Sequence, residues 1–301
     1  MTKRDLFLGA TAASSAEGFG AAIFGAPHGT PYKDVDNRIH AETANTLRAA
    51  LAADREMLES WDFDFGGPLL GTGGFRLADL GDLSTAPLDG AGNRHQITGR
   101  TREILGTGAV PIMIGGDDST PIPFIAGFAD HGPVTILQID AHIDWRDERF
   151  GERWGFSSTM RRASEMAHVK GMVQAGMRGM GSAREGEVRA ARAWGDNIVT
   201  AGAVHRDGVG PVLDLIPYGA RVLITFDCDA LDSAVMPAVS YPTPGGLGYQ
   251  QVIDLIAGVS AKAEIAGFDL VEFVPARDPD GRAAFTAARI ICNVIGALAK
   301  R

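Results

Sequence analysis

The chain has 301 residues, of which 45% are hydrophobic and 22% are charged, and its formal net charge at pH 7 is -9. This composition is ordinary for a globular protein with a large core, and it excludes a low-complexity or disordered chain. Because nucleic acids and anionic membranes attract basic surfaces, the acidic balance argues against both as partners and mildly favours a cationic substrate.

The N-terminal residues 1–20 are expected to form an extension of the fold. Lys3 and Arg4 precede a short apolar run at 6–13 that resembles a signal peptide, but Asp5 interrupts the pattern and small polar residues dilute it. No later stretch suggests a membrane span, and no linker or composition break divides the chain. We therefore expect one domain over residues 1–301 and a cytoplasmic location.

Apolar runs and amphipathic stretches alternate along the chain, which is the pattern of βαβ units. The runs that predict strands are 21–25, 76–80, 110–114, 134–139, 172–177, 197–200, 221–226 and 264–271. The stretches that predict helices include 42–56, 184–194, 249–259 and 282–299. The predicted fold class is therefore α/β, with three α/β/α layers around a central, mostly parallel sheet.

Carboxylates follow three of these predicted strands. The residues are Asp117 and Asp118 (GGDDS), then Asp140, His142 and Asp144 (DAHID), then Asp227, Asp229 and Asp232 (FDCDALD). Side chains two positions apart in an extended chain point to the same side, and the carboxyl ends of parallel strands meet at the edge where open α/β proteins bind ligands. A single Asp after a strand often only starts a turn, but this many carboxylates would repel one another without cations. The sequence therefore predicts a metal site.

With GGDDS, DAHID and FDCDALD in this order, the chain resembles the ureohydrolase family, which includes arginases and agmatinases. The segments 80–82 (LGD), 242–247 (PTPGGL) and 268–275 (FDLVEFVP) are similar to further family motifs, so the resemblance runs from about residue 21 to the C-terminus. It implies two manganese ions per chain. Asp140 and Asp227 would bridge the ions, Asp144 would complete one site, and His142 with Asp229 would complete the other.

The resemblance also implies a reaction. Glu272 matches the carboxylate that holds a substrate guanidinium, and Asp144 matches the group that passes a proton to the departing amine. Two cations lower the pKa of a shared water, so that hydroxide forms near neutral pH to attack the guanidinium carbon. Asp117 and Asp232 match supporting positions. The products would be urea and an amine.

The chain departs from the family at two histidine positions. Asp118 replaces the ligating histidine of GGDHS, which gives the first metal an all-oxygen ligand set that suits manganese or magnesium. Phe156 replaces a histidine near the substrate, and phenylalanine cannot transfer a proton. His28, in an early loop that borders the family's pocket, is a hypothesis for the missing imidazole. The other histidines are assigned surface or capping roles: His40, His95, His131, His168 and His205.

Agmatine is the predicted substrate. The chain lacks the NTP-type segment with which arginases hold an amino-acid head group, and Asp147 and Glu148 resemble agmatinase-type chains. Phe156 and Trp145 are expected to line the pocket. The arginines between 146 and 162 either pair with these acids or bind a substrate carboxylate, so guanidinobutyrate and guanidine remain alternatives.

A hypothesis of another class is a catalytically weak family member with a binding role. The loss of the two histidines at Asp118 and Phe156 motivates it, whereas the retained carboxylates argue against it. In either case the resemblance implies a homotrimer or homohexamer.

Overall fold

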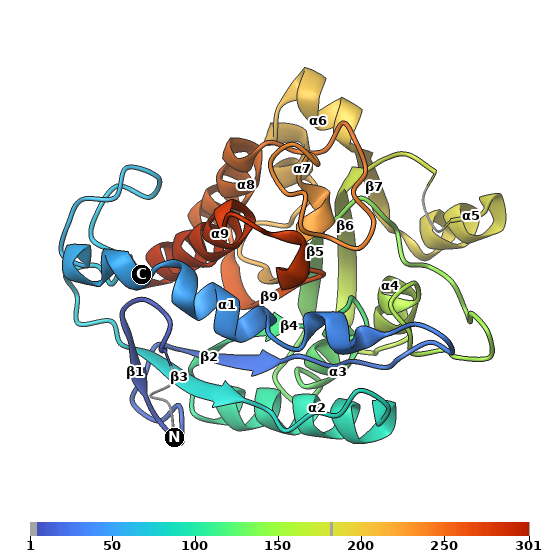
Figure 1. The fold of residues 1–301 in the computed structure, drawn as a ribbon. Coiled ribbons are helices and arrows are strands. Elements are labelled where there is room, and N and C mark those ends of the chain that lie inside the picture. Colours follow the sequence, from blue (N-terminus) through green and yellow to red (C-terminus); the bar gives the residue numbers. More distant parts are fainter. Residues whose placement is uncertain (1–4, 181–182, 301) are drawn as a thin grey trace.

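The computed structural model describes residues 5–180 and 183–300, and within them one nine-stranded sheet forms the centre of the molecule (Figure 1). The strands are β1 (Ala10–Ala12), β2 (Ala21–Ala26), β3 (Leu77–Asp82), β4 (Val110–Gly115), β5 (Val134–Ile139), β6 (Val169–Met177), β7 (Asn197–Thr200), β8 (Arg221–Asp227) and β9 (Glu264–Val271). Their order is β1-β3-β2-β4-β9-β8-β5-β6-β7, and every pairing is parallel. The central strands are buried on both faces, which explains their continuous apolar runs.

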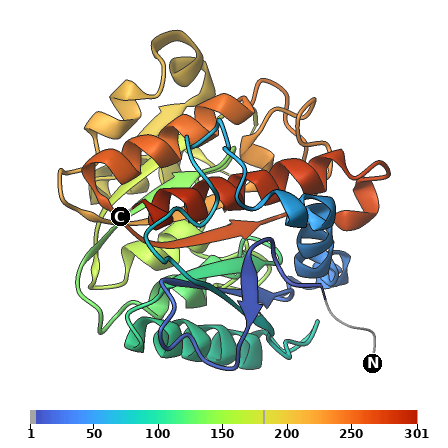
Figure 2. The same ribbon diagram turned by 90° about the vertical axis from the view of Figure 1, so that its left-hand side faces the viewer.

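Helices cover both faces of this sheet (Figure 2). They are α1 (Thr43–Ala50), α2 (Gly90–Gly106), α3 (Pro121–Ala126), α4 (Thr159–Ser164), α5 (Glu185–Trp194), α6 (Ala201–Asp207), α7 (Gly210–Asp214), α8 (Tyr249–Lys262) and α9 (Arg282–Ala299). Short 3₁₀ segments lie at Asn37–His40, Ala52–Met57, Cys228–Ala230 and Pro275–Arg277. One core cluster lies under α1 and α6 to α9, and the other lies under α2 to α5. The predicted three-layer α/β/α fold is confirmed.

The segment expected as an N-terminal extension belongs to the fold over residues 5–20. β1 pairs with β3, so that Ala10 stands opposite Leu77, and the buried Phe7 donates its N–H to the Asp79 carboxylate at 3.0 Å. The sequence did not predict this strand, because a three-residue edge strand gives no periodic signal. Residues 1–4 of the same expectation lie outside the described residues.

Helix α9 is long and apolar enough to cross a membrane by length and composition, contrary to the expectation that no later stretch would be. In the structure, 78% of it is buried inside the protein, and it packs against α1 and α8. Its hydrophobicity is therefore that of a core helix, which completes the layer on one face of the sheet.

Candidate metal centre and substrate pocket

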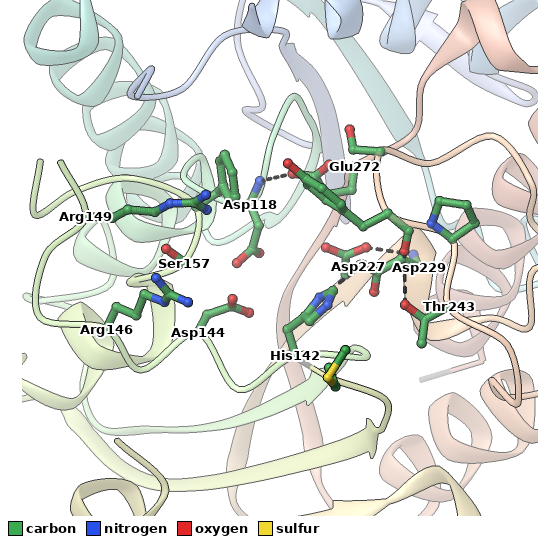
Figure 3. A pocket seen from close by; sticks show the side chains of 15 residues that line it. Asp118, His142, Asp144, Arg146, Arg149, Ser157, Asp227, Asp229, Thr243 and Glu272 are labelled. Carbon is green, nitrogen blue, oxygen red and sulfur yellow. Dashed lines mark hydrogen bonds and ion pairs between the residues drawn. The ribbon is translucent and has the colours of Figure 1, made fainter. Parts of the chain in front are cut away.

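A pocket of about 450 Å³ opens at the carboxyl edge of the sheet, where the chain leaves β4, β5, β8 and β9 (Figure 3). Five carboxylates and one imidazole line it: Asp118, Asp144, Asp227, Asp229, Glu272 and His142. The other lining residues are Arg146, Arg149, Phe156, Ser157, Met180, Ser240, Tyr241, Pro242 and Thr243. The three acidic strand ends therefore meet in one cavity, and β9 adds a fourth acidic strand end with Glu272.

Two groups of ligand atoms lie close enough for each to hold a cation. One group is Asp118, Asp140 and Asp144, and the other is Asp140, His142 and Asp229; within each, the ligand atoms lie within 4.8 Å of one another. Asp140 belongs to both groups, which is the position that a bridging ligand requires. Asp227, the second expected bridge, belongs to neither group but lines the same pocket.

Backbone N–H groups hold these carboxylates in place. Asp140 accepts from the N–H of His142 at 2.7 Å, and Asp227 accepts from the N–H of Asp229 at 2.7 Å. The Asp229 carboxylate accepts from the N–H of Ala141 at 3.2 Å and lies 3.1 Å from Nδ1 of His142. In both motifs the first Asp therefore caps the residue two positions later, which leaves its other lone pairs for a cation.

Asp118 is a buried carboxylate without a partner for its charge. It is 3% exposed, and neither carboxylate oxygen has a hydrogen-bond partner among the described residues. Burying an ionised carboxylate in this way is costly, and Asp140 and Asp144 lie beside it. A shared cation would remove this cost. The residues present therefore fit a divalent cation that prefers oxygen ligands.

Burial raises the pKa of Asp118, Asp144 and Asp227 well above the ordinary value, and neighbouring carboxylates raise it further. Burial lowers the pKa of His142, but its hydrogen bonds with Asp140 and Asp229 and their charges outweigh this effect and raise the pKa to about 12. The cluster therefore holds protons more tightly than exposed carboxylates do, and a cation that binds there must compete with them.

A row of polar side chains crosses the sheet just before the strands end in the carboxylates. Its members stand in lateral register on β6, β5, β8 and β9: Gln174, Gln138, Thr225 and Asp269. Nε2 of Gln138 donates to Asp140 at 2.6 Å and to Asp144 at 3.1 Å. Nε2 of Gln174 donates to Oε1 of Gln138, which fixes the orientation of that amide. The row thus orients two carboxylates of the first ligand group.

Asp144 and Glu272 share an uncommon backbone conformation. Their φ angles are 42° and 64°, and only two other non-glycine residues in the described part of the chain have positive φ. The N–H of Glu272 donates to the Gly116 carbonyl at 2.8 Å, which helps to hold that conformation. Such positions persist where the surrounding structure fixes them, and they cluster at functional sites. Both residues to which the resemblance gives catalytic roles are of this kind.

The glycine pair of GGDDS permits close packing around the pocket floor. A Cβ on Gly116 would overlap the Pro27 carbonyl, and a Cβ on Gly115 would overlap the side chains of Thr120 and Val271. The loop after β4 therefore passes directly against the loop after β2 and the end of β9. This contact places Asp118 beside Glu272, whose Oε1 accepts from the Asp118 N–H at 3.0 Å.

Glu272 also faces a histidine that the sequence did not assign to the site. Its Oε2 lies 3.8 Å from Nε2 of His40, whose Nδ1 pairs with the Phe273 carbonyl at 2.9 Å. His40 is 2% exposed, so the expectation of a surface or capping role is wrong. No sequence motif marks this histidine, because it reaches Glu272 from a distant 3₁₀ segment.

The proline- and glycine-rich loop after β8 is tied to the second ligand group. The Asp232 carboxylate accepts from the N–H of Gly245 at 2.7 Å, which closes the loop. Arg178 then donates to the carbonyls of Thr243 and Asp229 at 2.7 and 2.6 Å. Asp232 thus supports the wall of the pocket, as the resemblance implies. Arg178 was missed, although an arginine just beyond a strand end was the available signal.

Phe156 lines the pocket, as predicted. Its ring packs edge-on against Tyr32, with ring centroids 4.7 Å apart, and lies 6.5 Å from the ring of Tyr241. The Tyr32 hydroxyl pairs with Oγ of Ser157 at 2.6 Å. The position at which the family has a histidine is therefore part of an aromatic wall in this chain.

Comparison with known proteins agrees with this site. The model of the arginase family matches residues 20–296. The chain belongs to the arginase family. A mitochondrial guanidino acid hydrolase of Homo sapiens is 29% identical over 296 residues, which are 95% of this chain and 80% of that protein. An N(1)-aminopropylagmatine ureohydrolase of Thermus thermophilus is 34% identical over 193 residues, which are 64% of each protein.

The fold is also that of solved arginase-family structures. The proclavaminate amidino hydrolase from Streptomyces clavuligerus has a TM-score of 0.83 and 25% identity, with 99% of each chain covered. The resemblance to ureohydrolases is thereby confirmed. The general reaction of the family, hydrolysis of guanidino compounds, applies to this chain.

His28 does not line the substrate pocket, where the family resemblance had suggested that it would lie. It is absent from the pocket lining, it is buried, and its Nδ1 pairs with Oγ1 of Thr85 at 3.1 Å. Burial lowers its pKa. The loop that carries it packs against the GGDDS loop, where Thr30 donates its N–H to Oγ of Ser119 at 2.6 Å. The hypothesis that His28 supplies the missing imidazole to the substrate is therefore corrected.

Trp145 is likewise absent from the pocket lining. It is 2% exposed and packs in the core beside Trp194, with ring centroids 6.1 Å apart. Its neighbours Asp144 and Arg146 both face the cavity, so the intervening side chain points into the protein. The expectation that Trp145 lines the pocket is therefore wrong.

The arginines between 146 and 162 divide into two sets. Arg162 lies 2.7 Å from Asp147, Arg153 lies 3.1 Å from Asp147, and Arg161 lies 3.1 Å from Glu165. These three follow the salt-bridge interpretation. Arg146 and Arg149 line the pocket, as Figure 3 shows.

Proposed function

We propose that this chain hydrolyses a guanidino compound to urea and an amine, with the help of divalent cations. The observation that carries the proposal is the pair of ligand groups that share Asp140, placed around the same cavity as Glu272. Two ligand groups for metal cations, with Glu272 as a separate carboxylate beside them, suit a positively charged substrate that has an electrophilic carbon. Membership of the arginase family supports this reaction class.

In this proposal Glu272 binds and orients the guanidinium. One of its oxygens accepts from the Asp118 N–H and the other faces His40, so the carboxylate has a fixed orientation. The Asp144 carboxylate passes a proton to the departing nitrogen, and the Gln138 amide holds it in position. Phe156 covers part of the cavity wall and reduces the access of bulk water.

The cations would be held by two overlapping ligand sets. Asp118, Asp140, Asp144 and Asp227 would hold one, and Asp140, His142, Asp227 and Asp229 would hold the other. When bound, they supply activated water for attack on the guanidinium carbon. We propose two manganese ions per chain, with magnesium as the second choice at the all-carboxylate position, because that position offers only oxygen ligands.

Agmatine, hydrolysed to putrescine, is the substrate that the sequence predicts. The relatives' names include both an aminopropylagmatine ureohydrolase and a guanidino acid hydrolase, so family membership does not choose between them. The pocket lining bears on the choice. Arg146 and Arg149 line the same cavity as Glu272, and their positive charge favours a guanidino acid such as guanidinobutyrate over agmatine, whose far end is an ammonium.

Urea release tests the proposed reaction. Manganese-loaded protein is assayed with agmatine, guanidinobutyrate, arginine and guanidine, beside a reaction without protein. Urea from at least one of them supports the proposal, and no urea from any overturns it. Elemental analysis of the same preparation should give two metal ions per chain, and a single ion would refute the dinuclear arrangement.

A protein that binds guanidino compounds with little turnover is the second candidate. One observation favours it: His142 is the only imidazole among the described residues that line the pocket, and it belongs to a ligand group. Under this alternative, metal and guanidino ligands bind in calorimetry while urea release stays at the level of the reaction without protein.

We also propose a cytoplasmic homotrimer or homohexamer, from the family resemblance. Light scattering tests the assembly, and a monomer at micromolar concentration would refute it.

A further inference from the structure

Two arginines line a cavity whose remaining charges are almost all acidic. Arg146 and Arg149 follow β5 on the same loop, and both line the pocket that contains Glu272 and the ligand groups. In Figure 3 they lie on the opposite side of the cavity from Glu272, with Asp118 and Asp144 between. A substrate whose guanidinium contacts Glu272 would therefore extend its other end towards these arginines.

Arg149 is held by rings rather than by acids. Its guanidinium carbon lies 5.0 Å from the ring centroid of Phe150, 5.4 Å from that of Tyr32 and 5.9 Å from that of Phe156. No ion pair joins it to a carboxylate of the described residues, whereas Arg153, on the same loop, pairs with Asp147. Stacking positions a guanidinium and leaves its in-plane N–H donors available.

The backbone around Arg149 is fixed as well. Arg149 and Glu152 exchange backbone hydrogen bonds of 2.9 and 3.0 Å, and Phe150 between them has a φ of 54°. This tight turn presents the Arg149 side chain to the cavity and the Phe150 ring to its side. A fixed fork of N–H donors matches a carboxylate, which it binds through two parallel hydrogen bonds.

We infer that Arg149, with Arg146 beside it, binds the carboxylate of an ω-guanidino acid, so that the substrate is an anion at one end and a cation at the other. This inference rests on the proposed amidinohydrolase function and names its substrate class. Glu272 selects the guanidinium end and Arg149 selects the carboxylate end. Agmatine does not suit this arrangement, because its terminal ammonium would lie among arginines and would lose hydration without gaining an anionic partner.

The test compares substrates that share a guanidinium and differ in the far end. Manganese-loaded protein is assayed for urea with 4-guanidinobutyrate, 3-guanidinopropionate, agmatine and butylguanidine, whose tail is uncharged. We expect kcat/KM to be highest for a guanidino acid. Arg149→Gln should lower kcat/KM for the acids by roughly 10- to 100-fold, mainly through KM, and should change butylguanidine little. Arg149→Glu should shift the preference towards agmatine.

Arg153→Gln is the matched control, because this arginine belongs to the same loop and pairs with Asp147 outside the pocket. It should keep the substrate order of the unchanged protein. Arg149→Lys, which keeps the charge and loses the fork, should retain part of the preference for acids.

A binding measurement separates this inference from the proposed reaction. Calorimetry with metal-stripped protein compares 4-guanidinobutyrate with butylguanidine in the unchanged chain and in Arg149→Gln. If no substrate releases urea, the reaction class fails, yet tighter binding of the acid that depends on Arg149 still supports the inference. The inference is overturned if agmatine or butylguanidine is preferred, or if Arg149→Gln weakens all ligands equally.

Discussion

The side-chain amide of Gln138 donates a 2.6 Å hydrogen bond to the carboxylate of Asp140, the residue common to both ligand groups. A ligand in two sites must keep one orientation that suits both, and a neutral donor from the same strand fixes that orientation without adding charge. The Gln174 amide in turn fixes Gln138. The polar row across the sheet is therefore part of the candidate metal centre.

Gln138→Leu should weaken metal binding, because it removes this donor at nearly constant volume. We expect manganese affinity to fall about 10- to 100-fold, as for other changes that disturb a ligand's supporting partner. Calorimetric titration of metal-stripped protein measures it. Gln250→Leu, at an exposed position on α8, is the control. Equal affinities in both variants would contradict a supporting role for Gln138.

Asp118→His should broaden the choice of metal. The substitution places an imidazole in a group that otherwise offers carboxylates, and imidazole suits cobalt and nickel better than a carboxylate does. Competition between manganese and cobalt measures this preference. An unchanged metal preference would mean that Asp118 is not a ligand.

Glu272→Ala should separate substrate binding from metal binding. Glu272 belongs to neither ligand group, so both metals should stay bound while urea release falls by at least about 100-fold. Asp140→Ala, which removes the shared ligand, should instead lose metal and urea release together. Elemental analysis beside the urea assay distinguishes the two variants. Normal activity in Glu272→Ala would disprove its role with the guanidinium.

Asp196 should make the folded state less stable as the pH rises from about 4 to about 7. Burial of this carboxylate, neither of whose oxygens has a hydrogen-bond partner among the described residues, raises its pKa to about 7. Between the unfolded and the folded pKa the native chain holds a proton that the unfolded chain has released, so unfolding releases it and stability falls with pH. Asp196→Asn should remove this component.

Thermal unfolding of both proteins from pH 4 to 8 measures the slope. The gap in melting temperature should widen in favour of Asp196→Asn towards pH 8. Asp207→Asn, at an exposed carboxylate, should leave the slope unchanged. Parallel curves for Asp196→Asn and the unchanged chain would show that Asp196 is ionised in the fold.

Strands and acidic strand ends could be predicted because their signals are local. The runs at 134–139, 197–200 and 264–271 coincide with β5, β7 and β9, and the Asp spacing after β5 and β8 already implied convergence. Trp145 could not be placed, because the chain leaves the extended conformation after β5 and its next residues no longer alternate in a simple way. His40 acts through a contact with a residue far away in the sequence, which no local pattern records, and Arg178 was marked only by its position just beyond a strand end.

The strand order determines when the first ligand group can form during synthesis of the chain. β9 lies between β4, which leads to Asp118, and β8, which leads to Asp227, although it is the last strand to be synthesised. The first ligand group therefore draws its carboxylates from opposite sides of a strand that does not exist until the ribosome has passed residue 271. A nascent or truncated chain that ends before β9 can form two separate half-sheets but cannot bring Asp118 to Asp140. Cation loading of the first ligand group must therefore follow completion of the sheet, whereas the second group, at the ends of the neighbouring β5 and β8, does not depend on β9 in this way.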